Sequence, residues 1–122
     1  MRMSVCKMFR FDAAHFLPNY EGKCKNLHGH GWILEVEVEG SVAEESGFVI
    51  DFAFLKELMQ PLLDVLDHRC LNDVIVTPTC ENLLDYIWSH LSDQIRGETE
   101  GVVSLARLRL YETPDSFAEL KL

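Results

Sequence analysis

Alternation of apolar and polar residues predicts a strand near the start of the chain. Over residues 3–15 the odd positions are mostly apolar, whereas the even positions include Arg10 and Asp12. Side chains of a strand alternate between its two faces, so this pattern indicates a half-buried strand that ends at His15. Lys7 alone interrupts the apolar face.

A second strand with a stronger alternation is predicted over residues 32–40. Its apolar face carries Trp32, Leu34, Val36 and Val38, and its polar face carries Glu35, Glu37 and Glu39. The connection between the two strands is too short for the crossover helix that parallel strands need, so we expect antiparallel pairing. The end of the first strand then lies beside the start of the second.

Two helices are predicted in the middle of the chain. Apolar residues recur at helical spacing over residues 54–66, behind Asp51 as a suitable N-cap. Pro61 lies inside this pattern and should kink the helix or split it. A second helix should begin after Thr79 as N-cap and run to about residue 97. Its expected buried stripe consists of Leu84, Ile87, Trp88, Leu91 and Ile95.

The last part of the chain alternates again and completes the predicted fold. Residues 102–112 indicate a strand in which Ala106, Leu108 and Leu110 lie opposite Arg107 and Arg109, and residues 117–122 indicate a short last strand. The order β-β-α-α-β-β predicts an α+β fold in a single domain over residues 1–122, an antiparallel sheet with both helices on one face. The other face needs cover, which self-association would supply.

Composition narrows the classes of partner. The 122 residues are 48% hydrophobic, which suits one domain with one core. The 20 acidic and 11 basic residues give a net charge of −9, which argues against binding of nucleic-acid phosphates. No basic segment leads into an apolar signal core, and no apolar run reaches the roughly 20 residues that span a bilayer. We therefore expect a cytoplasmic protein with no nucleic-acid or membrane partner and with its four cysteines reduced.

A thiol and two imidazoles lie within seven residues between the first two strands, from Cys24 to His30. If the backbone is extended there, His28 and His30 point to the same face. Antiparallel pairing brings His15 towards them. Three histidines that leave a coordination position open are typical of catalytic zinc sites, and imidazole suits Zn²⁺ better than calcium or magnesium. For His28 and His30 alone, the alternative is a pair of surface or capping histidines.

Cys24 lies four residues before His28, between Lys23 and Lys25, whose positive charges favour a reactive thiolate. The spacing leaves its role open. It suits a fourth metal ligand, a nucleophile or a general base, and equally an inert, half-buried residue.

Two further sets of residues offer carboxylates. Asp67 and His68 suit the C-terminal end of a helix, or alternatively a carboxylate that orients an imidazole for proton transfer. Glu112 lies at a strand end in phase with Leu108 and Leu110. A buried carboxylate needs partners, and a ligand with adjacent N–H donors would be one.

Six motifs in this order resemble the 6-pyruvoyl-tetrahydropterin synthase family, and most closely its bacterial 6-carboxy-tetrahydropterin synthase branch of the queuosine pathway. They are residues 11–15, Cys24 with three residues before His28-Gly29-His30, residues 50–52, residues 66–68 followed by Leu71-Asn72, residues 78–82 and residues 112–114. The three-residue gap after Cys24 matches that branch, since the pyruvoyl-forming enzymes typically have a longer gap. The departures are Cys80 where serine is common, the pair Gly31-Trp32, and Cys70 near His68.

The resemblance implies a tunnelling fold (T-fold), in which three subunits join their sheets into a barrel and two trimers stack into a homohexamer with sites between subunits. It also implies the roles of the candidate residues: His15, His28 and His30 hold zinc; Cys24, Asp67 and His68 transfer protons; Glu112 anchors the pterin ring; and Thr79 and Glu81 line its pocket.

The reaction that the resemblance implies converts 7,8-dihydroneopterin triphosphate to 6-carboxy-5,6,7,8-tetrahydropterin, with release of acetaldehyde and triphosphate. Alternatives are 6-pyruvoyl-tetrahydropterin synthase activity, cleavage of another pterin side chain, and a non-catalytic zinc or pterin binding module. A three-histidine zinc hydratase or hydrolase would leave Cys24 and Glu112 without a role. Because the chain and the substrate are both anionic, local basic groups must offset their repulsion, and Lys23 and Lys25 are the candidates.

Overall fold

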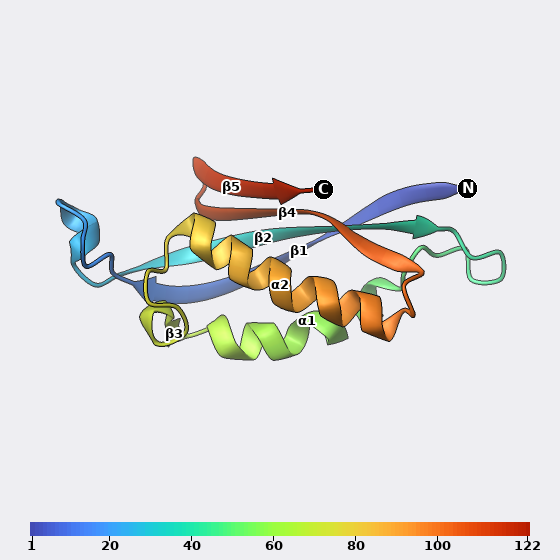
Figure 1. Ribbon diagram of the computed structural model, residues 1–122, viewed down its shortest axis with the longest axis horizontal. Helices are drawn as coiled ribbons and strands as arrows, with labels where there is room; N and C mark the ends of the chain where they lie inside the picture. Colours follow the sequence, from blue (N-terminus) through green and yellow to red (C-terminus); the bar gives the residue numbers. More distant parts are fainter.

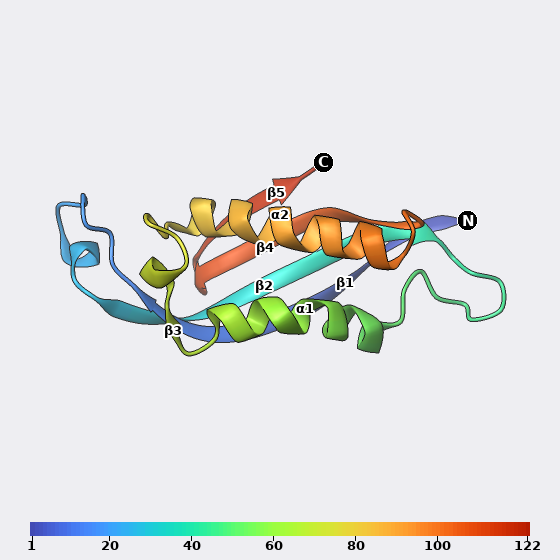
Figure 2. The same ribbon diagram turned by 60° about the horizontal axis from the view of Figure 1, so that its bottom comes forward.

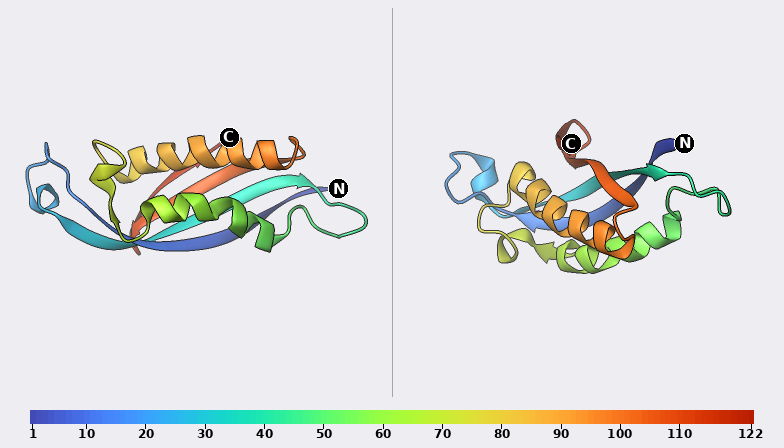
Figure 3. Two further views of the ribbon diagram at one scale, coloured as in Figure 1. Left: turned by 90° about the horizontal axis from the view of Figure 1, so that it is seen from below. Right: turned by 45° about the vertical axis from the view of Figure 1, so that its right-hand side comes forward.

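Two long helices pack on one face of a five-stranded sheet in the computed structural model, which describes residues 1–122 (Figures 1 and 2). The strands are β1 (Arg2–His15), β2 (His28–Ser41), β3 (Arg69–Cys70), β4 (Val103–Thr113) and β5 (Ser116–Lys121), and the helices are α1 (Phe52–Leu66) and α2 (Cys80–Glu98). Short 3-10 helices span Lys23–Lys25 and Leu71–Asp73. Figure 3 shows α1 and α2 side by side on the same face of the sheet, as the sequence predicts.

The sheet has the strand order β3-β1-β2-β4-β5. β1 and β2 pair antiparallel over their whole length, from Arg2 opposite Ser41 to His15 opposite His28. The pairs β2–β4 and β4–β5 are also antiparallel, which confirms the prediction for the long strands. β3 was not predicted from the sequence; it pairs parallel with β1 through two residues only. A strand of that length leaves no periodic pattern in the sequence.

Both helices begin at the predicted caps. The Asp51 carboxylate accepts a hydrogen bond from the Ala53 N–H at 2.9 Å, and the Thr79 hydroxyl accepts one from the Asn82 N–H at 3.1 Å. Of the two outcomes predicted for Pro61, the split of the first helix is wrong, because α1 is continuous through Pro61, and the kink stays a prediction. Proline has no backbone N–H, so the Glu57 carbonyl loses its helical partner at Pro61. Both residues are exposed, so solvent can hydrogen-bond to the Glu57 carbonyl. Neither helix is long and apolar enough to cross a membrane.

The hydrophobic core of 23 residues lies between the sheet and the helices. The fully buried large side chains are Trp32, Leu34, Leu55, Met59, Leu66, Leu71, Leu83, Ile87, Leu91, Ile95, Leu108 and Leu110. Leu83 therefore belongs to the buried stripe of α2, whereas Trp88, which the sequence placed there, is only half-buried.

A β-bulge in β4 corrects the predicted phase of that strand. Arg107 pairs with Glu37 and Leu105 pairs with Val38, so Ala106 has no partner on β2. The extra residue reverses the alternation, and Leu105 rather than Ala106 is buried.

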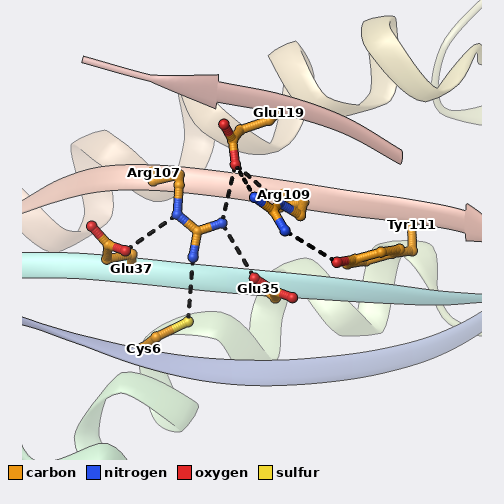
Figure 4. Close-up of polar contacts among 7 residues, drawn as sticks. All are labelled: Cys6, Glu35, Glu37, Arg107, Arg109, Tyr111 and Glu119. Atoms are coloured by element: carbon orange, nitrogen blue, oxygen red, sulfur yellow. Dashed lines mark hydrogen bonds and ion pairs between the residues drawn. The ribbon is translucent and has the colours of Figure 1, made fainter. Parts of the chain in front are cut away.

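The face of the sheet away from the helices carries a network of ion pairs (Figure 4). The Arg107 guanidinium contacts carboxylate oxygens of Glu35, Glu37 and Glu119 at 3.2, 3.2 and 3.3 Å. Arg109 contacts Glu119 at 2.8 Å. These ion pairs all form within one chain. The expected self-association stays a prediction.

Candidate active site

Three imidazoles meet at the shared end of β1 and β2. The antiparallel register places His15 opposite His28, and His30 lies two residues further along β2 on the same face. The ring centroids of these histidines are 4.7 to 5.1 Å apart. One ring nitrogen of each lies within 4.8 Å of the others, so all three can reach a single ion.

Backbone carbonyls orient two of the three rings. His15 Nδ1 donates to the Pro78 carbonyl at 2.8 Å, and His28 Nδ1 donates to the Asn26 carbonyl at 2.7 Å. A carbonyl can only accept, so each Nδ1 carries a proton, and in the neutral ring each Nε2 then keeps a free lone pair. This tautomer is the one that a metal ligand bound through Nε2 requires.

The Nε2 atoms of His15 and His30 are buried and have no hydrogen-bond partner. Buried polar atoms in folded proteins nearly always have a partner, and an ion that accepts both lone pairs would supply it. Burial also lowers the pKa of His30, because desolvation disfavours the imidazolium, and only the neutral ring can bind a metal. The donor set, its burial and its tautomers therefore fit a zinc ion.

Trp32 forms one wall of the three-histidine cluster. Its indole ring lies edge-on to His15 and His30, with centroid distances of 5.2 and 5.4 Å. Its Nε1–H donates to the Ala13 carbonyl at 3.2 Å, which fixes the ring. The sequence analysis treated Trp32 as a core residue only. The signal for its second role was its phase, since Trp32 continues the two-residue spacing of His28 and His30.

Four of the predicted site residues line one pocket of about 550 Å³, namely Cys24, Thr79, Glu81 and Glu112. The side chain of Glu112 is 28% exposed, and its Oε2 lies 3.7 Å from His15 Nε2. The pocket therefore adjoins the histidine cluster. The sequence does not predict that Glu112 contacts a histidine, because Glu112 lies in β4 and His15 in β1, which do not pair with each other.

The other residues that line this pocket come from the loop after β1, from the start of α2 and from β5. They are Leu17, Tyr20, Cys80, Ser116, Phe117 and Ala118. No pattern in the sequence indicates Tyr20 or Phe117 as pocket residues, since neither lies in a periodic segment beside the histidines. Cys80 Sγ donates to the Leu110 carbonyl at 3.2 Å, and burial raises the pKa of this thiol to about 11, so it stays protonated.

Cys24 is half-buried in the 3-10 helix Lys23–Lys25, and its carbonyl accepts a hydrogen bond from the Leu17 N–H at 2.8 Å. This bond closes the loop between β1 and β2 and holds Cys24 at the pocket. Lys23 and Lys25 are both exposed, and neither lines the pocket.

Asp67 and His68 form a pair that the structure does not bring to this pocket. Asp67 Oδ2 lies 3.0 Å from His68 Nδ1, and Asp67 Oδ1 accepts the Asp12 N–H at 2.9 Å. The Asp12 N–H lowers the pKa of Asp67, and the Asp67 carboxylate raises the pKa of His68. The pair lines one hollow with Arg10, and His68 lines a second hollow with His30. Within one chain, the His68 side chain is 77% exposed and apart from Cys24.

The sequence is similar to a known protein family over nearly its whole length. The profile of the 6-pyruvoyl tetrahydropterin synthase family matches residues 4–122. A 6-carboxy-5,6,7,8-tetrahydropterin synthase of Synechocystis is 38% identical over 121 residues, which cover 93% of this chain and 89% of the relative. The dihydroneopterin monophosphate aldolase of Pyrococcus furiosus is also 38% identical over 121 residues, which cover 99% of each chain.

A solved structure matches the whole fold. The 6-pyruvoyl tetrahydropterin synthase of Caenorhabditis elegans superposes with a TM-score of 0.87 at 28% identity, covering 100% of this chain and 96% of the other. Agreement of this extent confirms the predicted α+β T-fold.

Proposed function

Because the chain belongs to the 6-pyruvoyl tetrahydropterin synthase family and is a pterin lyase of that family, we propose that it is a zinc-dependent 6-carboxy-5,6,7,8-tetrahydropterin synthase. Its substrate is 7,8-dihydroneopterin triphosphate, and its products are 6-carboxy-5,6,7,8-tetrahydropterin, acetaldehyde and triphosphate, a reaction of queuosine biosynthesis. The observation that carries the proposal is the cluster of His15, His28 and His30, which can reach a single ion and in which His15 Nε2 lies 3.7 Å from Glu112 in the pocket of Cys24.

The three histidines are the proposed zinc ligands, each through Nε2. When bound, zinc supplies a Lewis acid that lowers the pKa of a substrate hydroxyl. The Pro78 and Asn26 carbonyls hold His15 and His28 in the tautomer that this binding needs. Trp32 packs against His15 and His30 and excludes water from behind the site.

Glu112 is the proposed anchor of the pterin ring. The edge of a pterin presents adjacent N–H donors, which a carboxylate can accept in a paired arrangement. The pocket around Glu112 has apolar and aromatic lining from Leu17, Tyr20 and Phe117, which suits a flat heterocycle. Thr79 and Glu81 line the same pocket. The Thr79 hydroxyl already accepts the Asn82 N–H, so it retains its own proton to donate to a ligand.

Cys24 and His68 are the proposed proton-transfer groups, and Asp67 orients His68 and favours its imidazolium form. His68 is exposed and lines a different hollow from Cys24 within one chain. We therefore assign the Asp67–His68 pair to the site of a neighbouring subunit in a homohexamer, a dimer of trimers. In that arrangement each site takes its thiol from one chain and its imidazole from another.

A second candidate function is aldol cleavage of a dihydroneopterin phosphate. The similarity to the Pyrococcus furiosus aldolase covers 99% of both chains, a larger share than that of the Synechocystis synthase. Aldol cleavage breaks the bond between two oxygen-bearing carbons, so the same zinc ligands and the same proton-transfer groups would serve it.

Product analysis on the zinc-loaded protein separates these functions. The carboxy synthase releases acetaldehyde from 7,8-dihydroneopterin triphosphate, whereas the pyruvoyl synthase releases triphosphate without acetaldehyde. An aldolase instead releases a phosphorylated two-carbon aldehyde from the monophosphate. Cys24→Ala should keep pterin affinity and lose turnover. A wild-type protein that binds pterin but converts neither substrate would contradict the proposal and indicate a binding module.

A further inference from the structure

The segment after α1 runs along the outer edge of β1 where β1 approaches the histidine cluster. The Asp12 N–H donates to Asp67 Oδ1 at 2.9 Å, and the His68 N–H donates to the Asp12 carbonyl at 2.6 Å. β3 then pairs with Ala13 and Ala14. The same segment therefore carries the Asp67–His68 pair and holds the strand that presents His15.

Asn72 extends this attachment beyond His15. Its Oδ1 accepts the Phe16 N–H at 3.0 Å, and its Nδ2 donates to the Phe16 carbonyl at 2.9 Å. These are the two bonds that the backbone of a neighbouring strand would make with Phe16. β3 ends at Cys70, where the chain turns into the 3-10 helix Leu71–Asp73, so the Asn72 side chain replaces the missing backbone partner.

His15 lies between the two attachments. Ala14 pairs with β3 on one side of it, and Phe16 bonds to Asn72 on the other. β2 does not pair with Phe16, because the β1–β2 register ends at His15 opposite His28. The Asn72 amide is thus the strand-like partner of the backbone that directly follows His15.

We propose that Asn72 is a positioning residue of the candidate active site, which fixes the His15 imidazole and holds it in a constant relation to the Asp67–His68 segment. The inference rests on the proposed function in one respect, since it takes His15 as a zinc ligand. Pro78, whose carbonyl accepts from His15 Nδ1, follows in the same connection to α2. Loss of the two hydrogen bonds between Asn72 and Phe16 would therefore disturb both the backbone and the ring of His15.

The test compares Asn72→Ala with Thr99→Ala, a matched control at the other end of α2. Thr99 Oγ1 donates to the Ile95 carbonyl at 2.7 Å and accepts the Val103 N–H at 3.3 Å. Its removal therefore also deletes one donated and one accepted hydrogen bond between a side chain and the backbone. Both variants should lower the melting temperature of the metal-free protein by similar amounts. Only Asn72→Ala should weaken zinc binding, measured by competition with a chromogenic chelator.

We expect Asn72→Ala to lose about tenfold in zinc affinity, the lower end of the effect of residues that orient metal ligands. The visible spectrum of the Co²⁺-substituted protein should change in intensity or position. The kcat should fall while KM changes less than twofold, because the pocket around Glu112 keeps its lining. Zinc affinity and a Co²⁺ spectrum equal to those of Thr99→Ala would overturn the proposal.

A metal-free measurement separates this inference from the proposed function. Nitrogen-15 NMR of the imidazoles should show His15 protonated at Nδ1 in the wild type and a mixture of tautomers in Asn72→Ala. If wild-type protein binds no zinc, the proposed function fails, and an unchanged His15 tautomer in the variant then rejects the positioning role separately.

If Asn72→Ala does not fold, Asn72→Asp keeps the acceptor for the Phe16 N–H and should show the same changes to a smaller extent. An Asn72→Asp variant identical to wild type in all readouts also rejects the role.

Discussion

Glu112→Gln tests whether Glu112 anchors the substrate. The substitution keeps the size of the side chain and one acceptor oxygen, but removes the charge and replaces the second acceptor by an amide. A hydrogen bond to a charged group contributes about 1.5 to 3 kcal/mol. Loss of one such bond to the pterin ring corresponds to an increase of roughly 10- to 150-fold in the dissociation constant. The Glu112 side chain is 28% exposed, so we expect a value towards the lower end of this range.

The assay is a titration of the zinc-loaded protein with a reduced pterin, followed by steady-state kinetics on the triphosphate substrate. The dissociation constant and KM should rise together, while kcat falls less, because the interaction exists before the reaction begins. Glu39→Gln is a matched control. Glu39 lies on β2, its side chain is half exposed, and it has one long contact of 3.9 Å with Arg2. It should leave both constants unchanged.

Because Glu112 lies close to His15, the zinc affinity of the Glu112→Gln variant is a second quantity to measure. Glu112 Oε2 lies 3.7 Å from His15 Nε2, so the charge of Glu112 should act on the proposed zinc site as well as on a bound pterin. Zinc affinity should fall slightly in Glu112→Gln. A pterin affinity and KM within twofold of wild type would refute the anchoring role, whatever happens to zinc affinity.

Further substitutions test the remaining groups. His30→Ala should reduce zinc affinity by more than the roughly 10- to 100-fold that follows loss of an outer-shell partner, and metal analysis after dialysis measures it. Asp67→Asn should lower the pKa of His68, because the carboxylate holds it above its usual value; an NMR titration that shows no change would contradict this cause. The protonated His68 stabilises the folded state below about pH 6.5, and this contribution is lost as pH rises through the raised pKa. Charge reversal of both Lys23 and Lys25 should raise KM for the triphosphate, and less so at high salt, whereas an unchanged KM would exclude both as phosphate-binding groups.

The histidine cluster was predictable because it depends on two short-range rules. Residues two apart share a strand face, which relates His28 to His30, and antiparallel pairing across a short connection brings His15 to them. Both rules act within the first 41 residues, where the alternation is strong. The caps Asp51 and Thr79 were predictable for the same reason, since a cap acts on the next few residues only.

Features that depend on contacts between distant segments were not predictable from the pattern. The bulge at Ala106 comes from the pairing of β4 with β2, and β3 exists only because its two residues meet β1. Likewise, nothing in the sequence indicates that Asn72 bonds to Phe16, or that Asp67 and His68 lie apart from Cys24 within one chain. Periodicity describes one element at a time, whereas these features need the register between two.

The groups of the candidate site divide between rigid strands and connecting segments. His15, His28 and His30 lie on β1 and β2, which pair through 14 residues each, so the position of an ion is fixed by the sheet. Cys24 and the Asp67–His68 pair lie in connections, where substitutions and changes of length cost less stability than in a sheet. A family that keeps the strands and varies the connections can therefore keep one metal site and change which bond of the pterin side chain breaks. This chain is 38% identical both to a synthase and to an aldolase, so we expect the residues that decide between the two reactions to lie in the connections, at residues 16–27 and 67–78.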